Sequence, residues 1–167
     1  YYLEGFGINK NSSYLINTDK ISLANGMHWT EVFPSGIVDL TLRHRDVVSE
    51  EEKYQQESLY LVDQWCNHYE KNIRELGGIG FFLGGIGPDG HIAFNVRGSD
   101  HNSTTRLTQT NFETQATAAV DLGGIEISRN RLVITIGLGT ITYNKEATAI
   151  IIAAGEAKAP IIQTSLE

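Results

Sequence analysis

Three short apolar runs constrain the fold of this chain more than any other feature. They are "GIGFFLGG" at residues 78–85, "RLVITIG" at residues 131–137 and "TAIIIAAG" at residues 148–155. Unbroken apolar runs of this length are typical of strands that are covered on both faces. Because helical stretches separate the runs, the sequence predicts an α/β fold with a parallel sheet and helices on both faces of that sheet.

The clearest helical segment lies at residues 49–76. Ser49 is a good cap for its first turn, and Glu52, three residues later, completes a capping box. Apolar side chains recur at three- and four-residue steps, and Gly77 and Gly78 supply a stop. The length of the segment leaves open whether it forms one helix or two. The other elements expected are a helix at residues 156–166 and two short strands at residues 13–17 and 36–42.

The composition is that of an ordinary globular domain, with 167 residues, of which 41% are hydrophobic and 20% are charged. Cys66 is the only cysteine, which excludes an internal disulfide and fits a reducing compartment. The net charge of −7 argues against a nucleic-acid surface. No apolar run is long enough to cross a bilayer. We therefore expect a cytoplasmic protein whose partners include neither nucleic acid nor a membrane.

A glycine-rich loop, "GGIGPDGHIAFN" at residues 84–95, follows the first apolar run. In parallel sheets, functional groups gather just beyond the carboxyl ends of strands. Asp89 and His91 in this loop form a pair suited to proton transfer, with the carboxylate orienting the imidazole or acting separately. The same residues also fit a glycine-rich turn in which Asp89 merely caps the next turn. The loop matches neither a dinucleotide-binding fingerprint nor a P-loop.

The loop resembles the signature of the glucosamine-6-phosphate deaminase/isomerase family, and the related 6-phosphogluconolactonases share its "G-x-G-x-D-G-H" portion. The resemblance continues in "STTRLT", "LVITIGLGTI" and "AAGEAKAPII", and covers roughly residues 79–167. It implies a three-layer α/β/α sandwich with a mostly parallel sheet. It also implies acid–base chemistry on a phosphorylated amino sugar: ring opening, proton movement between C1 and C2, and release of ammonia, with no metal or cofactor.

The resemblance also implies roles for individual residues of the loop. His91 matches the residue that shuttles the ring-oxygen proton, and Asp89 matches the carboxylate beside it. Gly85 and Gly87 match positions whose backbone N–H groups approach the sugar.

Two candidates lie outside the loop. Lys158, in "GEAKA", matches a lysine that contacts the substrate phosphate, and a lysine at a helix N-terminus adds its charge to the positive end of the helix dipole. Asp19, in "INTDKI", is a candidate for the base that removes the C2 proton, although the flanking residues depart from the family pattern. A plain polar turn is the alternative interpretation of Asp19.

Besides the residues that flank Asp19, the match to the family fails in two further places. The family motif continues with a glutamate that joins the aspartate and histidine, whereas this chain has Val96 at that position. Valine can neither donate a proton nor supply a charge, and the adjacent Arg97 stays protonated. Residues 1–48 contain nothing like the family's N-terminal phosphate loop. We therefore expect residues 1–167 to form a single sugar-phosphate isomerase-like domain that lacks this N-terminal segment and the C-terminal end.

Three functions remain open from the sequence. The leading one is a deaminase/isomerase that acts on a phosphorylated sugar, with a homo-oligomer as an open possibility. The second is a lactonase in which His91 activates water. The third is a sugar-phosphate-binding domain without catalysis. A metal site is a weaker alternative, with Asp89, His91, Asp100 and His101 as its ligands.

Overall fold

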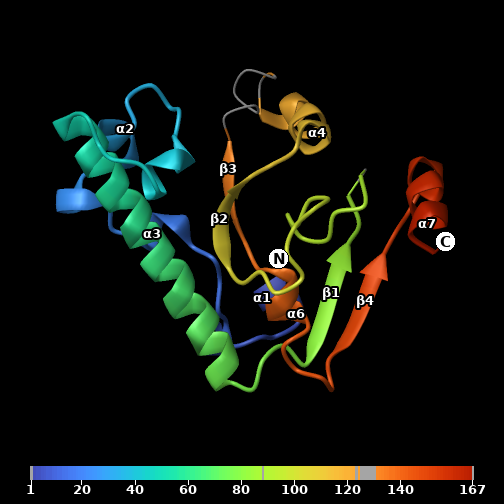
Figure 1. Cartoon of the computed structure of the whole chain (residues 1–167). Coiled ribbons are helices and arrows are strands. Elements are labelled where there is room, and N and C mark those ends of the chain that lie inside the picture. The colour runs from blue at the N-terminus through green and yellow to red at the C-terminus, as the bar shows by residue number, and fades with distance from the viewer. Residues whose placement is uncertain (1, 88, 123, 125–130, 167) are drawn as a thin grey trace.

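The computed structural model describes residues 2–87, 89–122, 124 and 131–166. Within them, four strands form two two-stranded sheets. Strand β1 (Phe81–Gly85) pairs in parallel with β4 (Thr148–Ile152), and β2 (Arg106–Gln109) pairs antiparallel with β3 (Leu132–Thr135) (Figure 1). All three predicted apolar runs contain a strand, and the α/β class with a parallel pairing is confirmed.

Helix α3 (Glu50–Glu75) is one continuous helix. The hydroxyl of Ser49 accepts a hydrogen bond from the N–H of Glu52 at 3.1 Å, as the cap predicts. The reciprocal half of the capping box is wrong, because the Glu52 carboxylate accepts from the N–H of Val48 at 2.8 Å instead. Gly77 and Gly78 have φ angles of 91° and 85°, and this left-handed backbone ends the helix where the sequence predicts.

The two strands predicted before α3 are wrong. Residues 13–17 have no strand partner among the described residues, and the chain then turns into a 3-10 helix, η2 (Thr18–Lys20). At the second position it forms another 3-10 helix, η4 (Leu40–Arg43). In both places a side-chain oxygen starts the turn, since Asn17 accepts from the N–H of Asp19 and Asp39 accepts from the N–H of Thr41. These local bonds compete successfully with extended structure.

The remaining elements before α3 are short. They are α1 (Tyr2–Gly5), η1 (Lys10–Ser12), η3 (Ala24–Gly26) and α2 (Trp29–Val32). Among the elements before α3, η3, α2 and η4 pack against this helix, and Leu42 and Leu59 are buried there, so the core gathers on α3.

A buried carboxylate joins α3 to the elements that follow it. Glu70 accepts hydrogen bonds from the backbone and the hydroxyl of Thr105, at 3.2 and 2.9 Å, and from the hydroxyl of Thr140 at 2.7 Å. Arg74 of the next turn also pairs with it, at 2.8 Å. Burial raises the pKa of Glu70, but these hydrogen bonds outweigh burial and leave the pKa below its usual range. Glu70 thereby holds the residue that precedes β2 and the short helix α6 (Leu138–Ile141) against α3.

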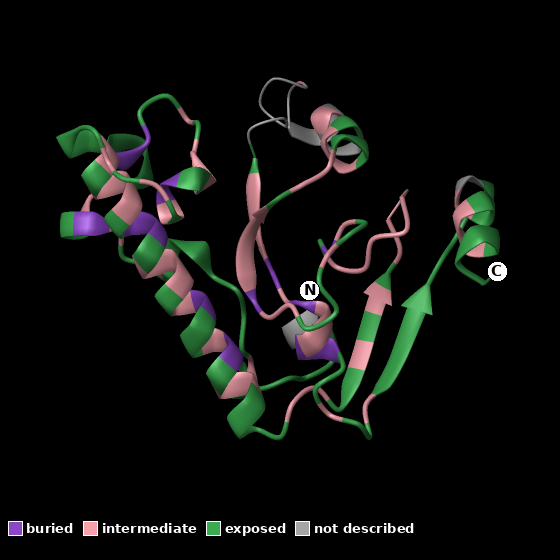
Figure 2. Ribbon diagram, in the orientation of Figure 1, coloured by how far each residue is buried: buried purple, intermediate pink, exposed green. Residues whose placement is uncertain are grey.

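Strands β1 and β4 differ from the expectation that both faces of the sheet are covered. All five residues of β4 are exposed and alternate residues of β1 are exposed, which Figure 2 shows as a green arrow and an arrow banded in green and pink. Helix α4 (Phe112–Leu122) follows β2, and η5 (Glu156–Lys158) leads from β4 into α7 (Ala159–Leu166), which contains most of the predicted last helix. None of the described helices is both long and apolar enough to cross a membrane.

Candidate active site

The loop at residues 84–95 leaves the carboxyl end of β1 and folds back on itself. The N–H of Gly87 donates to the carbonyl of His91 at 2.8 Å, and Ile86 and Ile92 form an antiparallel bridge. Gly90 has a φ of 90°, a backbone conformation that favours glycine. Asn95 then anchors the end of the loop, because its amide donates to the carbonyls of Ile92 and Ile136, at 3.0 and 2.9 Å.

Asp89 and His91 form a hydrogen-bonded pair within this loop. Oδ1 of Asp89 lies 2.5 Å from Nδ1 of His91, and the side chains are only 12% and 11% exposed. Burial raises the pKa of Asp89, but hydrogen bonds from His91 and Asn111 outweigh it and leave the pKa below its usual range. An ionised carboxylate only accepts hydrogen bonds, so Nδ1 of His91 is the donor to Asp89, and Nε2 is the ring nitrogen left to exchange a proton with a ligand.

The imidazole ring of His91 fits against a glycine. A Cβ at Gly87 would collide with three ring atoms of His91, Cε1, Nδ1 and Nε2. The ring also stacks on Phe94, with centroids 6.0 Å apart and planes 17° from parallel. The absence of a side chain at Gly87 is therefore what allows the ring to reach Asp89 in this orientation. The N–H of Gly87 is already engaged inside the loop, while Gly85 is paired with Ile152 in the sheet.

Lys158 reaches the same loop from the neighbouring strand. Because β1 and β4 are parallel and adjacent, their carboxyl ends meet, and η5 places Lys158 beside the loop. Its Nζ donates to the carbonyl of Ile86 at 2.6 Å. An ammonium carries three donors, so two of them remain for a ligand. Asp89, His91 and Lys158 are thus brought together around one loop.

Two residues that the sequence analysis missed complete the surroundings of the pair. Nδ2 of Asn111 donates to Oδ2 of Asp89 at 2.5 Å, and the hydroxyl of Thr114 lies 3.5 Å from Nδ1 of His91. Asn111 directly precedes α4, where an asparagine is a preferred N-cap, and this was the available sequence signal. Capping accounts for an asparagine at this position, so the sequence did not indicate that the side-chain nitrogen of Asn111 contacts Asp89.

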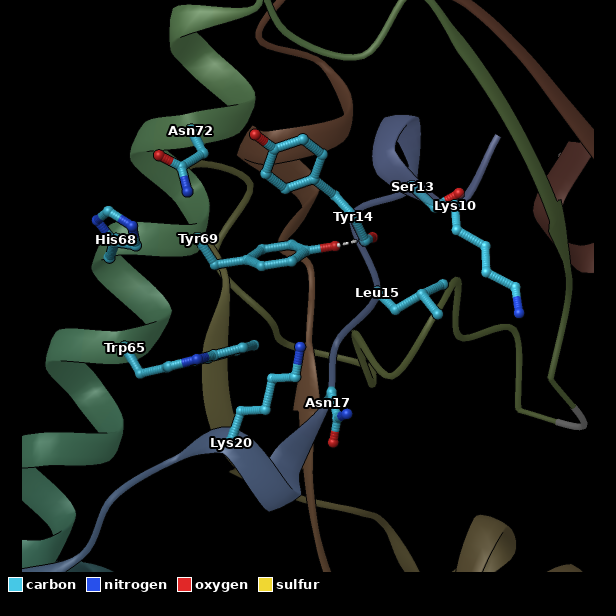
Figure 3. Close-up of a pocket in the computed structure, with 10 residues that line it drawn as sticks. All are labelled: Lys10, Ser13, Tyr14, Leu15, Asn17, Lys20, Trp65, His68, Tyr69 and Asn72. Atoms are coloured by element: carbon cyan, nitrogen blue, oxygen red, sulfur yellow. Dashed lines mark hydrogen bonds between the residues drawn. The ribbon is translucent and has the colours of Figure 1, made fainter. Parts of the chain in front are cut away.

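Asp19 is not joined to this group. It is exposed in η2, and no hydrogen bond or ion pair among the described residues links it to Asp89, His91 or Lys158. Its neighbours Asn17 and Lys20 line a different cavity of about 710 Å³. Figure 3 shows this cavity between the N-terminal segment and the Trp65 and Tyr69 side chains of α3.

The position after Asn95 offers no further acid. Val96 is partly buried, and its carbonyl accepts from the N–H of Ser99 at 3.0 Å. The described part of the chain also contains no cluster of three or more His, Cys, Asp or Glu side chains that would hold a metal ion. Among the described residues, the side chains hydrogen-bonded to the Asp89–His91 pair are Asn111, which precedes α4, and Thr114 in its first turn.

Comparison with known proteins gives a consistent set of relatives. No protein-family model matches the chain. The glucosamine-6-phosphate deaminase of Caenorhabditis elegans is 34% identical over 145 residues, which cover 83% of this chain and 51% of the relative. The glucosamine-6-phosphate deaminase of Phocaeicola vulgatus is 40% identical over 102 residues, covering 61% of this chain and 38% of the relative. The glucosamine-6-phosphate isomerase of Candida albicans is 38% identical over 91 residues, covering 54% of this chain and 37% of the relative.

A solved structure agrees with these similarities. It is a monomeric glucosamine-6-phosphate deaminase of the NagB superfamily, and it matches with a TM-score of 0.56 and 30% identity over 62% of this chain and 42% of that chain. The chain spans from about a third to a half of the length of the relatives it matches, between 37% and 51%. These sequence and structural similarities support the resemblance to the glucosamine-6-phosphate deaminase/isomerase family that the sequence motifs indicate.

Proposed function

We propose that the protein acts on a phosphorylated amino sugar: it opens the ring, moves a proton from C2 to C1, and lets water hydrolyse the resulting C2 imine to the ketose and ammonia. The observation that carries this proposal is the largely buried Asp89–His91 pair at the carboxyl end of β1, with Lys158 on the same loop. The names of the relatives give the substrate class, a glucosamine 6-phosphate.

The hydrogen bond between His91 and Asp89 suits His91 to carry the proton in ring opening. The C1–O5 bond of the cyclic sugar breaks, O5 gains a proton, and the hydroxyl on C1 loses one to become the aldehyde. Nε2 of His91 is free to accept and return that proton, because Nδ1 is held as the donor to Asp89. The negative charge of Asp89 stabilises the imidazolium that forms in between.

Fewer residues support substrate binding and the second proton transfer than support ring opening. The two unused donors of Lys158 suit a phosphate group. The backbone N–H groups of Gly85 and Gly87 stay predictions as sugar contacts, and so does Asp19 as the base for the C2 proton. With Val96 in the motif, ring opening rests on Asp89 and His91 alone.

The test is turnover by the full-length protein with glucosamine 6-phosphate as the substrate. We expect release of ammonia and formation of fructose 6-phosphate, and we expect His91→Gln to lower turnover by about 10² or more, in the range reported for the loss of a general acid–base group. His44→Gln, at an exposed position just after η4, is the matched control and should leave turnover unchanged.

Other outcomes would indicate a different function. Hydrolysis of 6-phosphogluconolactone with no ammonia release would indicate a lactonase, and sugar-phosphate binding without turnover would indicate a non-catalytic domain. Equal activity of wild type and H91Q would rule out the site. A single domain over residues 1–167, a cytoplasmic location and a homo-oligomer stay predictions, and one relative is described as monomeric.

A further inference from the structure

The side chain of Asn111 contacts the Asp89–His91 pair from a different part of the chain. Its Nδ2 donates to Oδ2 of Asp89 at 2.5 Å, while its Oδ1 accepts from the N–H of Thr114 at 3.0 Å. The first contact spans 22 positions in sequence and the second caps α4. One amide therefore connects the first turn of a helix to the carboxylate beside His91.

The orientation of this amide is fixed by its partners. The N–H of Thr114 can only donate, so it requires the oxygen of Asn111, and the ionised Asp89 can only accept, so it requires the nitrogen. Turning the amide over would place a donor against a donor and an acceptor against an acceptor. The direction of both hydrogen bonds follows from this chemistry.

With Asn111 in place, each oxygen of Asp89 has a partner. Oδ1 faces Nδ1 of His91, and Oδ2 faces the amide of Asn111, so rotation of the carboxylate about its Cβ–Cγ bond would break both contacts. We infer that Asn111 is a positioning residue that holds Asp89 against Nδ1 of His91 and thereby aims Nε2 at the reacting sugar. This inference rests on the proposed function for its catalytic consequence, but the Asn111–Asp89 contact is testable without it.

The support behind Asn111 makes this role physically reasonable. Asn111 lies between β2 and α4, and β2 is paired with β3 along its whole length. The residue that precedes β2, Thr105, is held by the buried Glu70 of α3. A side chain that must fix a reacting group is most effective when its own backbone belongs to such elements.

The charges near Asp89 determine what loss of Asn111 would do. In the described segments around Asp89, the titratable groups include His91 in the same loop, Glu113 in the first turn of α4, and Glu156 and Lys158 in η5. The hydrogen bond from Asn111 is one cause of the lowered pKa of Asp89. Its removal therefore raises the pKa of Asp89, and the acid side of any activity profile that needs ionised Asp89 moves to higher pH.

Two substitutions separate this role from helix capping. Asn111→Asp keeps a good cap for α4 but replaces the donor to Asp89 by an acceptor, and Asn111→Ser keeps a cap but is too short to reach Asp89. Asn144→Asp is the matched control. Like Asn111, Asn144 accepts a hydrogen bond from a backbone N–H, that of Glu146 at 2.9 Å, and this contact does not involve the loop. The control should behave as wild type in every measurement.

Carbon-13 titration of the Asp89 carboxyl group and steady-state kinetics of the full-length protein test the inference together. In N111D and N111S we expect Asp89 to titrate at higher pH than in the wild type. We also expect kcat to fall about tenfold or more with KM little changed, as is usual when a reacting group is misplaced by a fraction of an ångström to an ångström. Because both substitutions keep the cap, the thermal midpoint should fall only by what the lost hydrogen bond to Asp89 contributed, and further in N111D, where two carboxylates face each other.

The outcomes distinguish the inference from the function on which it builds. Unchanged Asp89 titration and unchanged kcat in both variants would overturn it and leave Asn111 as a helix cap only. If the wild-type protein turns over no phosphorylated sugar or lactone, the proposed function fails, whereas the carboxyl titration still decides whether Asn111 controls Asp89.

Discussion

Substitution of Gly87 by alanine tests the geometry of the site most directly. Gly87 does not have a positive φ, so its backbone conformation is available to alanine and the effect of the substitution is steric. The added methyl group would occupy space now taken by Cε1, Nδ1 and Nε2 of His91. Because no other atom is among its three nearest neighbours, the ring of His91 is the group that must move.

The size of the effect follows from what the ring would lose. Leaving its place breaks the charge-assisted hydrogen bond to Asp89, worth about 1.5–3 kcal/mol, and disturbs the stacking on Phe94, worth about 0.5–1.5 kcal/mol. A displacement of about 1 Å at a catalytic group costs on the order of 10²-fold in rate. We therefore expect G87A to fold and to turn over glucosamine 6-phosphate about 10²-fold more slowly.

The matched control for this prediction is Gly80→Ala. No atom lies within 4 Å of a Cβ at Gly80, and its φ is not in the left-handed region, so the methyl group is accommodated without loss. Ammonia release measured for wild type, G80A and G87A side by side gives the comparison, and a crystal structure of G87A shows the ring. Wild-type turnover by G87A, or an intact His91–Asp89 hydrogen bond in that structure, would refute the reasoning.

Three further predictions concern groups around the site. Glu70→Gln should lower the free energy of unfolding by about 1–3 kcal/mol, because the amide places a donor among the donors that now bind the carboxylate. Folding lowers the pKa of Glu70 from 4.5, so the ionised carboxylate stabilises the protein above pH 4.5 and this stabilisation is lost as the pH falls. The free energies of unfolding of wild type and E70Q, measured by urea denaturation, should therefore converge in acid. A difference that stays constant with pH would contradict this. Lys158→Met should raise KM for the phosphorylated sugar about tenfold or more through loss of a charged phosphate contact, whereas an equal KM would remove Lys158 from the site. Burial raises the pKa of the Cys66 thiol to about 11, so a thiol reagent at pH 8 should label it only after denaturation, and rapid labelling of the native protein would show that this part of α3 opens.

The parts of the fold that depend on neighbouring residues could be predicted from the sequence. Helix α3 has its cap and its stop within a turn of its ends, and β1, β3 and β4 lie inside apolar runs. Strand β2 was missed, because "RLTQ" is short and half polar and forms only by pairing with β3, more than twenty residues later. The predicted strands before α3 failed because Asn17 and Asp39 bond to the backbone two residues on, a choice that hydrophobic pattern does not reveal.

The same division holds for the site. Contact between Asp89 and His91 was one of the arrangements that the sequence left open, because two positions in one tight loop lie close together. Asn111 was not found, since only the packing of α4 against the loop brings it to Asp89. The placement of Lys158 beside the loop depended on the parallel pairing of β1 with β4, which the apolar runs favoured.

The exposed strand β4 has a consequence for how residues 1–167 behave when they are handled on their own. Thr148–Ile152 contains three consecutive isoleucines, no charge and no proline, and all five positions are open to solvent among the described residues. Such an uncovered segment is a template for pairing with another chain and for aggregation. Self-association there would place a foreign strand beside the one that leads to Lys158, so the concentration at which the protein is handled will bear on whether the site keeps its shape.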